Sequence, residues 1–60
     1  MYATTAPVSQ ISQGQRFKLD GEAAMMATQA ARQIGEKVVI PIVGGIVKVH
    51  RSVLAELLFD

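Results

Sequence analysis

The stretch Lys37-Val-Val-Ile-Pro-Ile-Val-Gly-Gly-Ile-Val-Lys-Val-His-Arg51 decides the fold that this sequence predicts. Eight of its fifteen residues are β-branched, and such side chains favour the pleated surface of a sheet over a helix. Gly44 and Gly45 separate the two β-branched runs, and glycines supply the positive φ angles of a tight hairpin turn. The stretch therefore predicts two antiparallel strands that are joined at Gly44-Gly45.

Side chains alternate between the two faces of a strand, and directly opposed residues share a face. One face of the predicted hairpin is aliphatic, and we expect it to be buried: Val38, Ile40, Ile42, Val47 and Val49. The other face is mixed and is expected to be exposed: Val39, Pro41, Val43, Ile46, Lys48 and His50. Pro41 has no N–H, so its side of the hairpin should be a sheet edge or a bulge.

The residues around the hairpin predict one more strand and two helices. Arg16–Leu19 alternates polar and apolar residues, which predicts a short strand with Phe17 and Leu19 inward. Glu22–Ile34 is rich in Ala and Met, with apolar residues at spacings of three and four, and this pattern predicts a helix that ends at Gly35. Ser52 is suited to cap a short final helix that reaches Phe59.

Residues 1–15 are small, polar and uncharged, with only Val8 and Ile11 as aliphatic anchors. Such a composition predicts a flexible N-terminal arm, because it has little apolar surface to offset the entropy of ordering. The predicted fold class is therefore α+β. Residues 16–60 form a small two-layer sandwich in the order β-α-β-β-α, and the arm precedes it.

Composition argues against several classes of function. The 60 residues include no cysteine and one histidine, so we expect no metal site and no cofactor. As a catalyst, His50 needs a nucleophile or a second acid–base group, and Ser52, two residues away, is expected to serve as a helix cap instead. We therefore expect neither an enzyme nor a small-molecule substrate. The longest apolar run, Val38–Val47, is shorter than the ~20 residues that cross a bilayer, and the N-terminus lacks a signal-peptide pattern. We therefore expect a cytoplasmic protein without a membrane partner.

The distribution of charge suggests two kinds of partner, although the net charge is only +1. If Phe17 and Leu19 point inward, one outer sheet face collects the basic side chains of Arg16, Lys18, Lys48 and His50. An acid-free basic face is expected for a small regulatory protein that binds nucleic acid. The alternative is a protein-binding inhibitor or adaptor that uses the apolar part of this face and the N-terminal arm. The order strand, helix, strand also resembles many small phage-borne inhibitors.

Half of the residues are hydrophobic, which is much aliphatic surface for so short a chain to bury. Short chains without disulfides or metals often gain stability by association. We therefore expect a homodimer. The candidate interface collects aliphatic and aromatic residues of the outer face and the chain end: Val39, Val43, Ile46, Leu58 and Phe59.

Overall fold

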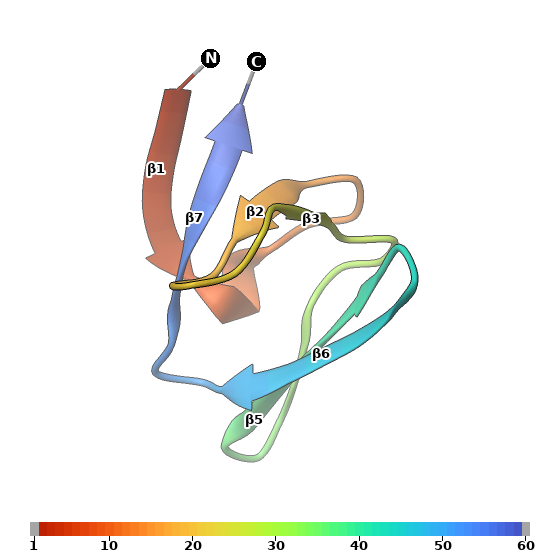
Figure 1. Cartoon of the computed structure of the whole chain (residues 1–60). Coiled ribbons are helices and arrows are strands. Elements are labelled where there is room, and N and C mark those ends of the chain that lie inside the picture. Colours follow the sequence, from red (N-terminus) through yellow and green to blue (C-terminus); the bar gives the residue numbers. More distant parts are fainter. Residues whose placement is uncertain (1, 60) are drawn as a thin grey trace.

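The computed structural model describes residues 2–59 and shows an all-β protein (Figure 1). Seven strands form two antiparallel sheets, and the described residues contain no α-helix. The four-stranded sheet has the order β1-β7-β2-β3, with bounds Tyr2–Pro7, Leu54–Phe59, Arg16–Lys18 and Met25–Met26. The three-stranded sheet has the order β4-β5-β6, with bounds Arg32–Ile34, Lys37–Ile42 and Gly45–His50. One 3-10 turn, η1 (Val8–Gln10), follows β1. The predicted α+β class is therefore wrong.

The predicted hairpin is present as β5 and β6, but its turn lies one residue earlier. Ile42 pairs with Gly45, so the two turn residues are Val43 and Gly44. Gly44 has a φ of 91°, whereas Val43 has no positive φ. This is the pattern of a type II turn, in which only the second central residue needs a positive φ. Each β5 residue thus faces a partner two positions earlier in β6 than predicted, and an even shift leaves the two faces unchanged.

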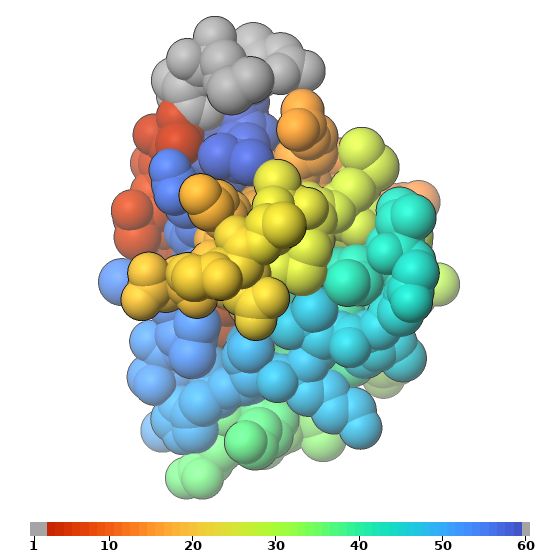
Figure 2. Space-filling model, viewed as in Figure 1, coloured from red at the N-terminus to blue at the C-terminus, as the bar shows by residue number. Residues whose placement is uncertain are grey.

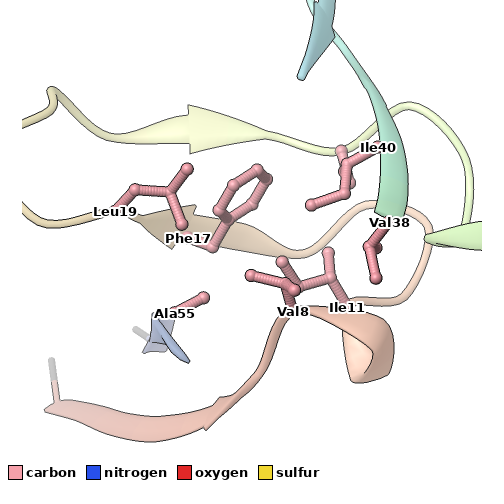
Figure 3. Close-up of a cluster of buried hydrophobic side chains, with 8 residues drawn as sticks. Val8, Ile11, Phe17, Leu19, Val38, Ile40 and Ala55 are labelled. Atoms are coloured by element: carbon pink, nitrogen blue, oxygen red, sulfur yellow. The ribbon is translucent and has the colours of Figure 1, made fainter. Parts of the chain in front are cut away.

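The core lies between the two sheets, and Figure 3 shows its side chains converging. Its buried members come from every part of the chain: Val8, Ile11, Phe17, Leu19, Ala27, Val38, Ile40 and Ala55. Phe17 and Leu19 point inward, as the alternation in Arg16–Leu19 predicts. The aliphatic hairpin face also lies inward, with Val38 and Ile40 buried and with Ile42, Val47 and Val49 packed against the core.

The predicted flexible arm is an ordered part of the fold. β1 pairs along its whole length with β7, from Tyr2 opposite Phe59 to Pro7 opposite Leu54. The side chains of Val8 and Ile11 are 0% and 2% exposed, and both belong to the core. The two aliphatic anchors of the segment therefore order it, because they complete a core that residues 16–60 do not fill alone.

The predicted helix Glu22–Ile34 is also absent, and β3 and β4 occupy this segment. Ala27 joins the two sheets. Its N–H donates to the carbonyl of Gln15 at 3.0 Å, its carbonyl accepts from Gly14 at 2.8 Å, and it forms a bridge with Ile42. A helix here would bury mainly alanine methyl groups, whose apolar area is small. In the extended conformation the same segment forms hydrogen bonds with both sheets. The stabilisation from these hydrogen bonds outweighs the intrinsic helix propensity of alanine.

Gly35 has a positive φ of 62°, but it does not end a helix. Ile34 pairs with Lys37, so Gly35 and Glu36 form the two-residue turn between β4 and β5. Glycine at the first central position suits a type II′ hairpin turn. The carbonyl of Glu36 also accepts a hydrogen bond from the N–H of Arg51 at 2.8 Å, which extends the pairing beyond β6.

The predicted final helix is the strand β7, which lies between β1 and β2. Ala55 is buried, whereas its neighbours Leu54 and Glu56 are exposed. A central strand hydrogen-bonds two neighbours, and a two-turn helix at this position would leave β1 and β2 unpaired. The leucine-rich sequence therefore adopts the conformation that the adjacent strands require.

Pro41 lies where the edge of β5 changes its partner. β4 pairs with β5 only as far as Val39. From Pro41 onward, the end of β3 and the residues after it replace β4. The N–H of Thr28 donates to the Pro41 carbonyl at 2.8 Å, and the N–H of Val43 donates to the Met26 carbonyl. Pro41 thus marks a break in the ladder at the place where its N–H is missing.

Residues 2–59 include no helix with the length and apolar character needed to cross a membrane.

Candidate nucleic-acid interface

The four basic residues predicted to share one face lie in two different sheets. Arg16 and Lys18 are exposed on β2, on the side of the four-stranded sheet opposite to Phe17. Lys48 and His50 are exposed on β6 in the three-stranded sheet. Figure 1 shows β2 and β6 in separate parts of the molecule. The structure therefore brings together Lys48 and His50, but it does not bring Arg16 and Lys18 to the same face.

Lys18 lies among acidic residues. It is directly opposite Glu56 on β7, and Glu56 is in turn opposite Thr5 on β1. These residues line a pocket of about 240 Å³ together with Asp20, which follows β2. In Figure 2 the connection between β2 and β3, shown in yellow, crosses the middle of the molecule. The face of the four-stranded sheet is therefore mixed in charge.

The outer face of the three-stranded sheet has a different composition, which follows from the register. Arg32, Val39 and Lys48 lie in one row across β4, β5 and β6. The next row is Ile34, Lys37 and His50. Directly opposed residues share a face, and the neighbouring residues Val38 and Ile40 point into the core. We call the outward set Arg32, Lys37, Lys48 and His50 the basic face.

All four side chains of the basic face are exposed. None of the outward positions on these three strands is acidic, and the nearest carboxylate along the chain is that of Glu36 in the β4–β5 turn. Within residues 2–59, Arg32, Lys37 and Lys48 make no side-chain hydrogen bond or ion pair. Their charges are therefore available to an anionic partner.

Ser52 fixes the imidazole of His50. The backbone N–H of Ser52 donates to His50 Nδ1 at 3.1 Å, and the Ser52 hydroxyl lies 2.8 Å from the same atom. A backbone N–H can only donate, so Nδ1 is an acceptor and the proton of the neutral ring is on Nε2. His50 thus presents an N–H donor at Nε2. Ser52, which the sequence predicts as a helix cap, instead orients this donor.

The predicted partner interface does not form one surface. Val39 is half-buried in the middle of the basic face, and Ile46 and Val43 lie at the turn end of the hairpin. Leu58 and Phe59 belong to β7 in the other sheet. Leu58 is opposite Arg16 on the outer side of that sheet, whereas the next residue, Phe59, belongs to the opposite side.

Sequence reasoning missed Arg32 and Lys37. Both belong to the strands that the Gly35-Glu36 turn connects, and a Gly-X pair between Ile34 and Lys37 is a hairpin signal. Within the part of the chain that the structure describes, no three His, Cys, Asp or Glu side chains gather as they would around a metal ion.

Comparisons with protein-family models, curated proteins and solved structures find no match for this chain.

Proposed function

We propose that this protein is a small non-enzymatic regulatory protein that binds nucleic acid by holding the phosphate backbone on its basic face. The observation that carries the proposal is the segregation of charge. Arg32, Lys37 and Lys48 are exposed on one sheet face that has no acidic residue, in a protein whose net charge is only +1. Phosphate contacts from such side chains supply most of the sequence-independent affinity for nucleic acid.

The size of the basic face fits a short piece of backbone. Arg32 and Lys48 lie in one row but two strands apart, which is roughly 10 Å at a strand spacing of ~4.8 Å. One strand of duplex DNA carries one phosphate per ~3.4 Å of helix axis, so cations spread over this distance can reach a few consecutive phosphates. Lys37 lies on the strand between them. We therefore assign one phosphate contact to each of these three cations, with the Nε2–H of His50 as an additional donor.

The remaining residues of the face suit backbone contact better than base recognition. Val39, Pro41 and Ile46 are aliphatic or cyclic, and Ile34 completes the set. No aromatic side chain is present among them on which a base could stack. We therefore expect binding with little dependence on nucleotide sequence.

The salt dependence of binding tests the proposal. Three phosphate contacts predict a log–log slope of affinity against salt of about −2.7 for duplex DNA and about −2.1 for single strands. The Lys37→Ala/Lys48→Ala variant should reduce the duplex slope to about −0.9. Anisotropy titrations of labelled duplex DNA, single-stranded DNA and RNA at several salt concentrations measure these slopes. Absence of binding at low salt to all three probes would contradict the proposal.

A second candidate function is a protein-binding inhibitor or adaptor. The observation in its favour is the exposure of Ile34, Val43 and Ile46, which are 61%, 68% and 62% exposed. Aliphatic docking depends only weakly on salt, unlike phosphate binding. A partner captured from the source extract that stays bound at high salt, and that the Val43→Ser/Ile46→Ser variant loses, would favour this second function.

A further inference from the structure

The strand β1 is an edge strand, and its open edge differs from those of the other edge strands. β1 lies at the end of the four-stranded sheet, and within residues 2–59 β7 is its only strand neighbour (Figure 1). Its six residues, Tyr2–Pro7, carry no charge. Among the other described outer strands, β6 carries Lys48 and His50, β4 has three residues that include Arg32, and β3 has two. Charge, shortness and proline normally protect sheet edges from pairing with another chain. β1 has neither charge nor shortness, and its one proline, Pro7, lies at the end of the strand and leaves Ala3 and Thr5 with outward N–H groups.

The ladder between β1 and β7 shows which backbone groups point outward. The N–H of Val8 donates to the carbonyl of Val53 at 3.2 Å, one step beyond the pair Pro7–Leu54. Backbone groups alternate in direction along a strand, so the even-numbered residues of β1 face β7. Ala3, Thr5 and Pro7 therefore direct their backbone groups away from the sheet. Pro7 has no N–H to leave unpaired there, as suits an edge position.

We propose that a second copy of this chain pairs antiparallel with the open edge of β1 around a two-fold axis at Thr5. In this register the two Thr5 residues exchange both backbone hydrogen bonds. The N–H of Ala3 in each copy donates to the Pro7 carbonyl of the other copy, which gives four hydrogen bonds in total. The four-stranded sheets of the two copies then become one continuous eight-stranded sheet.

Three features of β1 favour a second copy as the occupant. An isologous interface requires a surface that complements itself. The outward backbone donors and acceptors around Thr5 meet this requirement, because a two-fold rotation places each donor opposite an acceptor. Two uncharged edges also approach each other without repulsion, whereas nothing on β1 selects a charged partner. Opposed threonines are a favourable cross-strand pair. The inference is independent of the nucleic-acid proposal, because the basic face belongs to the other sheet.

Replacing Thr5 tests the edge with little disturbance of the monomer. Thr5→Pro removes an outward N–H and no hydrogen bond to β7, and proline is tolerated at a sheet edge, so the variant should keep the circular dichroism spectrum of the wild type. Thr5→Val is the matched control, because it keeps the N–H and a β-branched side chain. Sedimentation equilibrium at micromolar concentration should show wild type and Thr5→Val at 12.8 kDa, twice the chain mass of 6.4 kDa. The Thr5→Pro variant should remain at the mass of one chain.

A cross-link keeps the inference testable if the proline variant fails to fold. The chain has no cysteine, so a single introduced thiol reports its own neighbour. Thr5→Cys should oxidise rapidly to a covalent dimer, because paired Cα atoms in a sheet lie within the ~4.4–6.8 Å range of a disulfide. Ser12→Cys, also exposed, is the control and should cross-link slowly. A monomeric wild type, a dimer that survives Thr5→Pro in the folded protein, or equal cross-linking of the two cysteines would overturn the inference.

Discussion

Truncation of Ile11 tests whether the N-terminal segment is part of the core. The side chain of Ile11 is 2% exposed, and its carbonyl accepts a hydrogen bond from Ala31 at 2.9 Å. Removing a buried isoleucine side chain to alanine costs about 2–5 kcal/mol, and Ile→Val costs about 0.5–1.5 kcal/mol. At ~0.05–0.15 kcal/mol per residue, the whole chain has roughly 3–9 kcal/mol of stability. We therefore expect Ile11→Val to be folded but weakened, and Ile11→Ala to be close to unfolding.

Urea denaturation followed by far-ultraviolet circular dichroism measures this loss. With a slope of ~1 kcal/mol per molar urea for so small a protein, a loss of about 2 kcal/mol moves the midpoint by about 2 M. Ile34→Ala is the matched control, because Ile34 is 61% exposed and should change the midpoint by less than ~0.5 M. If Ile11→Ala and Ile34→Ala have the same midpoint, the N-terminal segment does not contribute to the core and the reasoning is refuted.

Two further pairs of variants test the hairpin. Gly44→Ala should destabilise the protein by about 1–2 kcal/mol, because the φ of 91° at Gly44 disfavours an L side chain. Gly45→Ala, at a residue without a positive φ, should cost much less. Thermal unfolding compares the two variants, and equal losses of stability would place the turn at Gly44-Gly45. Ile40→Asp should abolish the fold, because a buried unpaired carboxylate costs several kcal/mol, whereas Ile46→Asp at a position 62% exposed should leave it intact. Circular dichroism distinguishes the two, and a folded Ile40→Asp variant would show that the two faces are inverted.

The parts of the fold that the sequence predicts are those set by local alternation. The period of two in Val38–Val49 assigns the buried and exposed faces, and Phe17 with Leu19 lies inward for the same reason. The helices could not be excluded in this way, because Ala-rich and Leu-rich segments have high intrinsic helix propensity. Ala27 is extended because its own backbone hydrogen-bonds Gly14 and Gln15 while its neighbours Met26 and Thr28 hydrogen-bond Val43 and Pro41. β7 is extended because it lies between β1 and β2. These are contacts between residues distant in sequence, which local propensity does not contain.

The candidate site shows the same division. The exposure of Lys48 and His50 follows from their place in a predicted strand. Lys37 lies on β5 opposite His50 and shares its face with Val39 by the same alternation. Only Arg32 depends on the pairing of β4 with β5, which the predicted helix conceals. Arg16 has the expected exposure but belongs to the other sheet. Which strands share a sheet is thus the information that decides the composition of the basic face.

The most direct test of the proposed function compares two double variants that lose the same charge from different sheets. Lys37→Ala/Lys48→Ala removes two cations from the basic face, and Arg16→Ala/Lys18→Ala removes two from the four-stranded sheet. At ~50 mM salt the loss of two phosphate contacts should weaken binding to labelled duplex DNA on the order of 100-fold. We predict this loss for Lys37→Ala/Lys48→Ala and a much smaller change for Arg16→Ala/Lys18→Ala. Equal losses in the two variants, or the larger loss in Arg16→Ala/Lys18→Ala, would contradict the assignment of nucleic-acid binding to the basic face.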